Sequence, residues 1–205
     1  MGLRLLIFSL WTPKYIIRKE LANVSDRTTT ALKMLIAKNA SKEVDFKDQE
    51  QEYPSSIQEQ RAIMAQAHAK LVETLEATVG REQAVKLGRQ ALFSVGQNLG
   101  KQYRIKLGVG DNPKDLTRGA KILYRVLGID FRLKWVDNSN AEAIIDRCAL
   151  AEEYSKLTCE VLSATDEGVI KGLQPNVTMN FREYMTGGCK NCRAEIHFNE
   201  KEIGQ

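Results

Sequence analysis

The four cysteines are the residues of this sequence with the most distinctive chemistry. Cys189 and Cys192 form a Cys-x-x-Cys pair in GGCKNCRAEIHF, and Cys148 and Cys159 stand 11 residues apart before them. Eleven steps of about 100° return a helix to nearly the same face, so one helix could present both earlier thiols. Four converging thiolates would suit zinc or an iron–sulfur cluster. Three interpretations of the cysteines are open: they form a metal or cluster site, they have a thiol function without metal, or they are buried residues that only pack.

Several familiar catalytic signatures are absent from the sequence. It has no Gly-x-Gly-x-x-Gly or Walker loop, and no Gly-x-Ser-x-Gly nucleophile elbow. Its two histidines, His68 and His197, are too few for a zinc site built on several imidazoles. We interpret His68 as a packing or surface residue and His197 as a solvated strand residue.

The composition is that of an ordinary soluble globular protein. Of 205 residues, 43% are hydrophobic and 27% charged, and the net charge is +4, with basic and acidic residues intermixed, so we expect no nucleic-acid partner. The apolar start MGLRLLIFSLW is shorter than the roughly 20 residues of a membrane span and shows no cleavage site. We interpret it as a packing or partner-binding segment, with membrane-surface contact as the alternative, and expect a reducing cytoplasmic location.

The periodicity of apolar residues predicts helices first and strands later. Helical patterns cover residues 13–38, 56–79, 81–99 and 112–127, and the polar stretch NASKEVDFKDQEQEYPSS reads as a linker. Alternating patterns then predict a strand at 129–135 with its partner at 141–146, a helix from Leu150 to Val161, and a closing hairpin of 176–185 and 191–198.

These elements predict an α+β fold, with N-terminal helices followed by an antiparallel sheet covered by helices. We expect residues 1–55 to be a helical extension and linker and 56–205 to be the α+β domain. The helical stripes at 57–75 and 84–99, together with the N-terminus, offer more apolar surface than one small sheet is expected to cover. This surplus predicts a homodimer or larger homo-oligomer.

The segment from residue 141 to residue 198 resembles the L-2-amino-thiazoline-4-carboxylic acid hydrolase family. It contains RCALAEEYSKLTCEVLSATDEG, an x-Pro entry into a strand, and a glycine turn with a last cysteine before an alternating strand. More distantly it is similar to vinyl-reductase-type small-molecule-binding domains. The resemblance extends more weakly back to residue 56 and does not cover the first 55 residues.

The resemblance implies which residues to examine. Cys148, Cys159 and Cys192 fall on the family's recurrent cysteines, and Asp166 falls on its acidic position. Cys189 is an addition peculiar to this chain. The family often has proline after its first cysteine, where this sequence has Ala149, and this departure bears on the activity more than on the fold.

Two functions follow as hypotheses. In a hydrolase that opens a cyclic amidine C–N bond, Asp166 or Glu167 would be the base for water, assisted by a thiolate or a thiolate-held metal. Arg147, Arg182 or Arg193 would hold the substrate carboxylate. As an alternative without catalysis, Asp166 and Glu167 would be the N-cap and first-turn residues of a helix. The arginines would then be solvated residues on the exposed face of strands. The alternative is a sensor-like module that binds a small molecule or metal without catalysis.

Overall fold

The fold is α+β, as the sequence predicts. The computed structural model describes residues 3–40, 46 and 55–199. Five helices come first: α1 (Leu3–Leu10), α2 (Lys14–Asn39), α3 (Ile57–Val79), α4 (Arg81–Leu107) and α5 (Pro113–Leu127). They are followed by β1 (Ile129–Trp135), β2 (Asn140–Cys148), α6 (Lys156–Leu173), β3 (Val177–Glu183), a short 3₁₀ turn at Met185–Gly187 and β4 (Cys192–Phe198). The strands form one antiparallel sheet in the order β1-β2-β4-β3.

The helix starts and ends follow local capping chemistry. Ser56 and Glu59 form the expected capping box at the start of α3. Asn112 caps α5, which has Pro113 in its first turn and ends at Gly128 in the left-handed conformation. The closing hairpin predicted at 176–185 and 191–198 is present as β3 and β4.

Helix α6 differs from the sequence prediction. The helix expected over 150–161 begins only at Lys156, with Ser155 as its N-cap, and it continues without a break to Leu173. Asp166 and Glu167 therefore lie in the middle of a helix, and the N-cap interpretation of these two residues is wrong. The stretch SAT does not start a helix, because it already lies within α6, where the hydroxyl of Ser163 donates to the carbonyl of Glu160.

Glycines on α4 and α6 let the two helices cross at backbone contact. A Cβ atom on Gly96 would lie 2.0 Å from the carbonyl oxygen of Thr165, and one on Gly100 would lie 2.3 Å from that of Val169. Gly168 of α6 faces α4 in the same way, 2.2 Å from the Phe93 carbonyl. This crossing fixes the position of α6, which carries Cys159 and Asp166.

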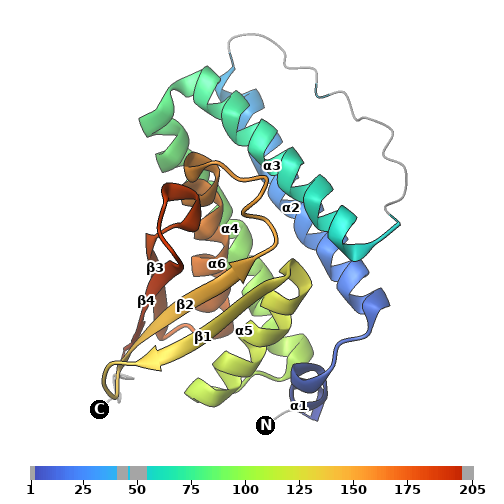
Figure 1. Cartoon of the computed structure of the whole chain (residues 1–205), viewed down its shortest axis with the longest axis vertical. Helices are drawn as coiled ribbons and strands as arrows, with labels where there is room; N and C mark the ends of the chain where they lie inside the picture. Colours follow the sequence, from blue (N-terminus) through green and yellow to red (C-terminus); the bar gives the residue numbers. More distant parts are fainter. Residues whose placement is uncertain (1–2, 41–45, 47–54, 200–205) are drawn as a thin grey trace.

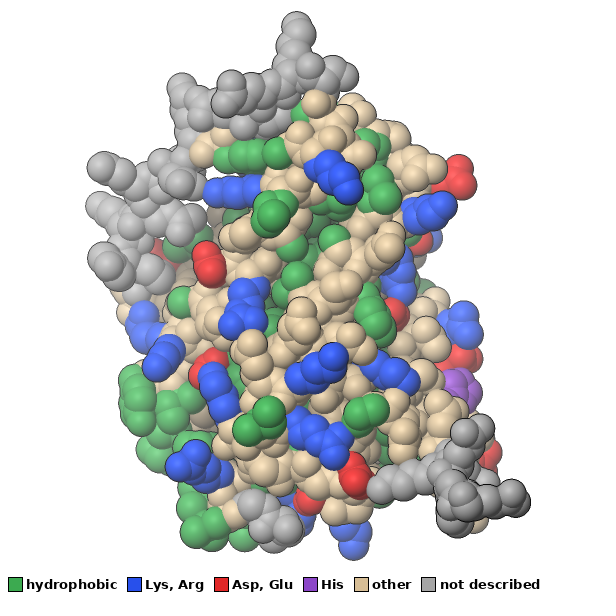
Figure 2. All heavy atoms as spheres, turned by 180° about the vertical axis from the view of Figure 1, so that it is seen from behind, with side chains coloured by type: hydrophobic (Ala, Val, Ile, Leu, Met, Phe, Trp, Pro, Cys, Tyr) green, Lys and Arg blue, Asp and Glu red, His purple; other side chains and the backbone are tan. Residues whose placement is uncertain are grey.

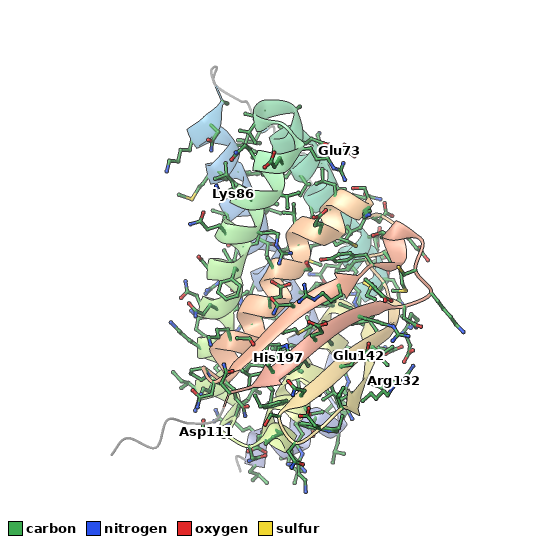
Figure 3. All side chains as sticks on the ribbon, turned by 90° about the vertical axis from the view of Figure 1, so that its left-hand side faces the viewer. Glu73, Lys86, Asp111, Arg132, Glu142 and His197 are labelled. Atoms are coloured by element: carbon green, nitrogen blue, oxygen red, sulfur yellow. The ribbon has the colours of Figure 1, made fainter. Side chains whose placement is uncertain are left out.

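The sheet has one face on the helices and one face open to solvent. Ala143, Ala194 and Met179, from three different strands, are buried in the main core cluster. Figure 3 looks onto the open face, where Arg132, Glu142 and His197 are labelled. No described helix is long and apolar enough to cross a membrane.

The N-terminal helices share the core with the rest of the chain. Leu21, Leu32 and Ile36 of α2 are fully buried, and α2 runs beside α3 (Figure 1). Most of the expected linker lies outside the described residues. The inner stripe of α3, including Val72 and Leu75, is likewise fully buried within one chain.

Candidate functional site

A cavity of about 90 Å³ lies between the helices and one end of the sheet. The sheet contributes the first residue of β1, the ends of β2 and β3, and the start of β4. Helices α2, α3, α5 and α6 supply most of the remaining walls, with Leu150 and Tyr154 from the segment before α6 and Tyr184 after β3. Its lining includes Val24, Thr28, Met64, His68, Tyr124, Leu127, Ile129, Ile145, Cys148, Leu150, Tyr154, Cys159, Leu162, Ser163, Thr165, Asp166, Phe181, Tyr184 and Cys192. Most of these side chains are apolar or aromatic, as in a typical small-molecule site.

Asp166 supplies the carboxyl group of this cavity. Burial raises the pKa of Asp166 from 3.8 to about 7, with a further rise from the charge of Glu167, while the Tyr124 hydroxyl opposes the shift. A carboxyl that titrates near neutrality can donate or accept a proton under cellular conditions. Asp166 is therefore the titratable group of this cavity best suited to proton transfer.

Two hydroxyl groups stand beside Asp166 without a hydrogen bond. Tyr124 Oη and Thr165 Oγ1 are both buried and have no hydrogen-bond partner among the described residues. Tyr124 is near enough to lower the pKa of Asp166, but the pair does not reach hydrogen-bonding geometry. The same three residues also line a second cavity of about 40 Å³, so they form a wall that both cavities share. Buried polar groups normally have hydrogen-bond partners, so these two hydroxyls are exceptions in the cavity wall.

His68 is a structural link in the cavity wall. Its Nε2 lies 2.6 Å from Thr28 Oγ1 of α2 and its Nδ1 lies 2.7 Å from Tyr154 Oη. Burial lowers the pKa of His68 to about 4, so the ring is neutral at physiological pH. The packing interpretation of His68 is confirmed, because this chain of three side chains joins α2, α3 and the segment before α6.

Three of the four cysteines line the cavity, but they do not form a metal site. Cys148, Cys159 and Cys192 line it, whereas Cys189 is exposed in the turn before β4. Across the described part of the chain, no three His, Cys, Asp or Glu side chains are grouped so that they could hold a metal ion. The cluster of four cysteines predicted from the sequence is therefore not formed in this part of the chain, and Cys189 lies exposed in the turn.

The cavity thiols are in their neutral form. Burial raises the pKa of Cys148 to about 11 and that of Cys159 to about 12, and burial also raises the pKa of Cys192. A thiol must lose its proton to act as a strong nucleophile or metal ligand. Neutral, largely buried thiols agree with the packing alternative for Cys148 and Cys159, and Cys192 lies in the same wall.

Glu167 does not face the cavity, although it is adjacent to Asp166. Its carboxylate accepts a hydrogen bond of 2.7 Å from Arg89 of α4 and one of 3.1 Å from the backbone N–H of Phe181 in β3. Glu167 thus ties α6 to both α4 and the sheet. The structure separates the two predicted bases, with Asp166 in the cavity and Glu167 in a buried ion pair.

The arginines expected to hold a substrate carboxylate lie away from the cavity, and Arg193 pairs with Glu142 and Glu183. Arg147 pairs with Asp130 at 2.7 Å and Arg182 pairs with Glu195 at 2.9 Å, both between exposed side chains on strands. The solvated-strand interpretation fits these positions. None of these guanidinium groups is placed to meet a molecule in the cavity.

Sequence reasoning missed Tyr124 and Thr165, whose hydroxyls lie in the cavity wall. Tyr124 lies within the apolar helical pattern predicted over 112–127, where a tyrosine looks like a packing residue. Tyr154 falls within the helix predicted from Leu150 to Val161, but it lies in the segment before α6. No sequence signal distinguishes a tyrosine that packs from one whose hydroxyl enters a cavity.

Comparisons with solved structures agree with this fold. A trafficking protein particle complex subunit 3 from Naegleria fowleri, solved covalently bound to palmitic acid, has a TM-score of 0.53 at 13% identity, covering 68% of this chain and 95% of that one. The phenol-responsive sensory domain of the transcription activator PoxR, solved with phenol, has a TM-score of 0.54 at 15% identity, covering 82% and 88%. At such identities the likeness shows the fold alone. Comparison with curated proteins gave no match.

The family comparison is more specific. The model of the L-2-amino-thiazoline-4-carboxylic acid hydrolase family matches residues 60–196, more than half of the 205-residue chain. The match contains the whole cavity except the part contributed by α2, and it leaves out the first 55 residues, as the resemblance implied. The chain belongs to the L-2-amino-thiazoline-4-carboxylic acid hydrolase family.

Proposed function

We propose that this protein binds a small, mostly apolar molecule in the main cavity, with the polar group of that molecule against Asp166. The observation that carries the proposal is the placement of a carboxyl with a pKa near 7 beside two unpartnered hydroxyls in an apolar cavity. A ligand with one or two hydrogen-bonding groups would satisfy Tyr124 and Thr165. Such sites combine apolar walls with a few polar groups that fix orientation.

The charge of the cavity favours a neutral or cationic ligand. The described lining contains Asp166 and no lysine or arginine. A carboxylate brought into this cavity would be buried without a cation and close to another carboxyl group, which is costly. A protonated amidine ring would instead pair with ionised Asp166, so the ligand that fits is an amidine-like or hydroxyl-bearing ring without a carboxylate.

The size of the cavity limits the ligand to a single small ring. The main cavity measures about 90 Å³. An apolar cavity of about 150 Å³ binds benzene in an engineered protein. A five- or six-membered ring would therefore need small movements of flexible lining side chains such as Met64.

Hydrolysis of a cyclic amidine C–N bond is the second candidate, favoured by family membership and by Asp166. In this reaction ionised Asp166 takes a proton from water as the water attacks the amidine carbon. It then returns that proton to the nitrogen that leaves. Because the ionised form is the base, the rate should rise as the pH increases through about 7. Asp166→Asn should abolish ring opening while the fold is kept.

A matched pair of compounds tests both candidates. Calorimetry at pH 8 should show that 2-aminothiazoline binds at least about tenfold more tightly than 2-aminothiazoline-4-carboxylate, since an unpaired buried charge costs more than the 1.4 kcal/mol of a tenfold change. Chromatography of the same mixtures measures ring opening. The control is Cys189→Ser, which alters an exposed thiol outside the cavity.

The outcomes separate the proposals clearly. Binding of 2-aminothiazoline that is lost in Asp166→Asn, without turnover, supports a binding module. Turnover that increases through pH 7 and is lost in Asp166→Asn supports the hydrolase. Tighter binding of the carboxylated compound, or binding unchanged by Asp166→Asn, would show that ligands do not meet Asp166 in this cavity.

A further inference from the structure

Helix α1 presents an apolar face to solvent. Leu3, Ile7, Leu10 and the following Trp11 have exposed fractions between 48% and 77%. At about 100° per residue, the three helical members lie within a narrow arc on the side opposite Leu5, which is fully buried. Such a face on a folded chain marks a surface that another body covers.

The orientation of α1 is fixed by the rest of the fold. Leu5 enters the main core cluster, and the guanidinium of Arg125 in α5 donates to the carbonyl oxygens of Phe8 and Ser9, each at 2.9 Å. Arg125 also donates to the hydroxyl of Thr12 at 3.1 Å. A cation at the carboxyl end of a helix satisfies carbonyls that have no partner within the helix. The contacts of Leu5 and Arg125 therefore hold the apolar face of α1 towards solvent.

The charged side chains of α1 and of the first turn of α2 are all positive. Residues 3–19 contain no aspartate or glutamate. Arg4, Lys14 and Lys19 are exposed and have no ion-pair partner in the part of the chain that the structure describes. Figure 2 shows hydrophobic side chains gathered at the lower left, where α1 lies, with lysine and arginine side chains beside them.

We propose that α1, together with Trp11 and the first turn of α2, docks on the surface of an anionic lipid bilayer. The apolar arc would enter the boundary between headgroups and acyl chains, and Arg4 and Lys14 would meet the anionic headgroups. Trp11 and Tyr15, both exposed, are of the residue types that gather at this boundary. The helix lies in the surface plane, because eight residues span only about 12 Å.

A lipid surface fits this face better than a second copy of the chain. A symmetric dimer would bring the same patch of both subunits together, and the basic residues of each would face those of the other. A helix of this length and about 10 Å in width also covers far less than the roughly 800 Å² per partner of a stable interface. An anionic surface removes both difficulties, because it supplies the opposite charge and requires no matching protein area.

Tryptophan fluorescence provides a direct test. The chain has two tryptophans, so Trp135→Phe leaves Trp11 as the single reporter. We expect its emission to shift to shorter wavelength with vesicles of phosphatidylcholine and 30% phosphatidylglycerol. Pure phosphatidylcholine should have a much weaker effect. In vesicle flotation, the wild-type chain should likewise bind the anionic vesicles more tightly than pure phosphatidylcholine. Salt at 0.5 M should weaken this binding.

Variants separate the apolar and the electrostatic contributions. In flotation, Leu10→Ser with Trp11→Ser should reduce binding at least about tenfold. Arg4→Gln and Lys14→Gln should each reduce it about fivefold. The matched control is Met34→Ser with Ile105→Ser, which removes two other highly exposed apolar side chains and should leave binding unchanged.

Three results would overturn the proposal. The first is an unshifted Trp11 emission with anionic vesicles. The second is equal binding of the α1 variant and the Met34 and Ile105 control. The third is a dimer in light scattering that Leu10→Ser with Trp11→Ser dissociates, because that would identify a second copy as the occupant of this face.

Discussion

Asp166 and Glu167 show how neighbouring residues of one type acquire different roles. One helical step of about 100° turns Asp166 into the cavity and Glu167 towards Arg89 and the backbone of β3. The sequence marks both carboxylates as candidate bases, but it cannot say which one enters the cavity. Burial sets the pKa of each carboxyl, and the position around the helix sets the direction of each side chain. The same limit applies to the cysteines, where three reach the cavity and the turn leaves Cys189 outside.

Asp166 should make the stability of the protein depend on pH in an identifiable way. Its pKa is about 7 in the folded chain, above its ordinary 3.8, so its stabilising contribution is complete below 3.8 and is lost as the pH rises through 7. Compared with Asp166→Asn, the wild-type chain should therefore lose on the order of 2 kcal/mol of unfolding free energy between pH 5 and pH 8. Urea denaturation at several pH values measures this difference.

The surface variant Asp130→Asn serves as the control for this measurement. Asp130 is exposed on the sheet and pairs with Arg147, so its replacement should leave the pH dependence close to that of wild type. If Asp166→Asn and the wild-type chain show parallel pH dependence, Asp166 does not hold a proton in the folded state.

At the scale of elements, periodicity predicted most helices and all four strands, but not the way α4 and α6 meet. The alternating apolar residues of 129–135, 176–185 and 191–198 were sufficient for the strands, since one face of this sheet is buried. The start of α6 was placed too early, because Leu150 and Tyr154 continue the apolar pattern although they precede the helix. Glycines four residues apart, at 96 and 100 and at 168 and 172, were the available signal for the close crossing.

The crossing of α4 and α6 should be sensitive to one added methyl group. In Gly96→Ala the new Cβ would lie 2.0 Å from the Thr165 carbonyl, which is backbone and cannot rotate away. We expect a loss of about 2 kcal/mol in unfolding free energy, even though alanine favours the helix by about 1 kcal/mol. Ligand affinity should fall as well, because Asp166 follows Thr165 directly.

Gly119→Ala is a matched control for this substitution. Gly119 also lies within a helix, but the nearest atoms to its Cβ would be side-chain methyls of Val109 and Leu173, at 3.3 and 3.6 Å. Its unfolding free energy should change by less than about 1 kcal/mol. Equal effects of the two substitutions would mean that the backbones of α4 and α6 are not in contact at Gly96.

At the scale of the whole molecule, the N-terminal helices complete the cavity. Val24 and Thr28 of α2 line it, and the hydrogen bond between Thr28 and His68 fixes that wall. The helical stripes from which a homodimer was predicted are covered within one chain, as Val72, Leu75 and Leu92 show. The homodimer and the cytoplasmic location stay predictions, to be tested by light scattering and by fractionation.

Removal of residues 1–55 tests how far the α+β part depends on the N-terminal helices. Leu32 and Ile36 of α2 belong to the same core cluster as Val72 and Leu75 of α3, and all four are fully buried. Without α2 this apolar surface would face water, at a cost of about 1.5–3 kcal/mol for each large side chain. That total approaches the stability of a typical domain, so we expect residues 56–205 to unfold without a cooperative transition and to bind hydrophobic dyes.

A chain of residues 14–205 is the informative comparison, because it loses α1 but keeps α2 and every described cavity residue. We expect it to melt cooperatively at a lower temperature than the full chain, since Leu5 no longer fills the core and Arg125 loses its carbonyl partners. It should also retain the ligand affinity of the full chain while losing the vesicle binding proposed for α1. Cooperative melting and unchanged ligand binding of residues 56–205 would instead establish that the family-matched part folds alone and that α2 is only an accessory to the cavity.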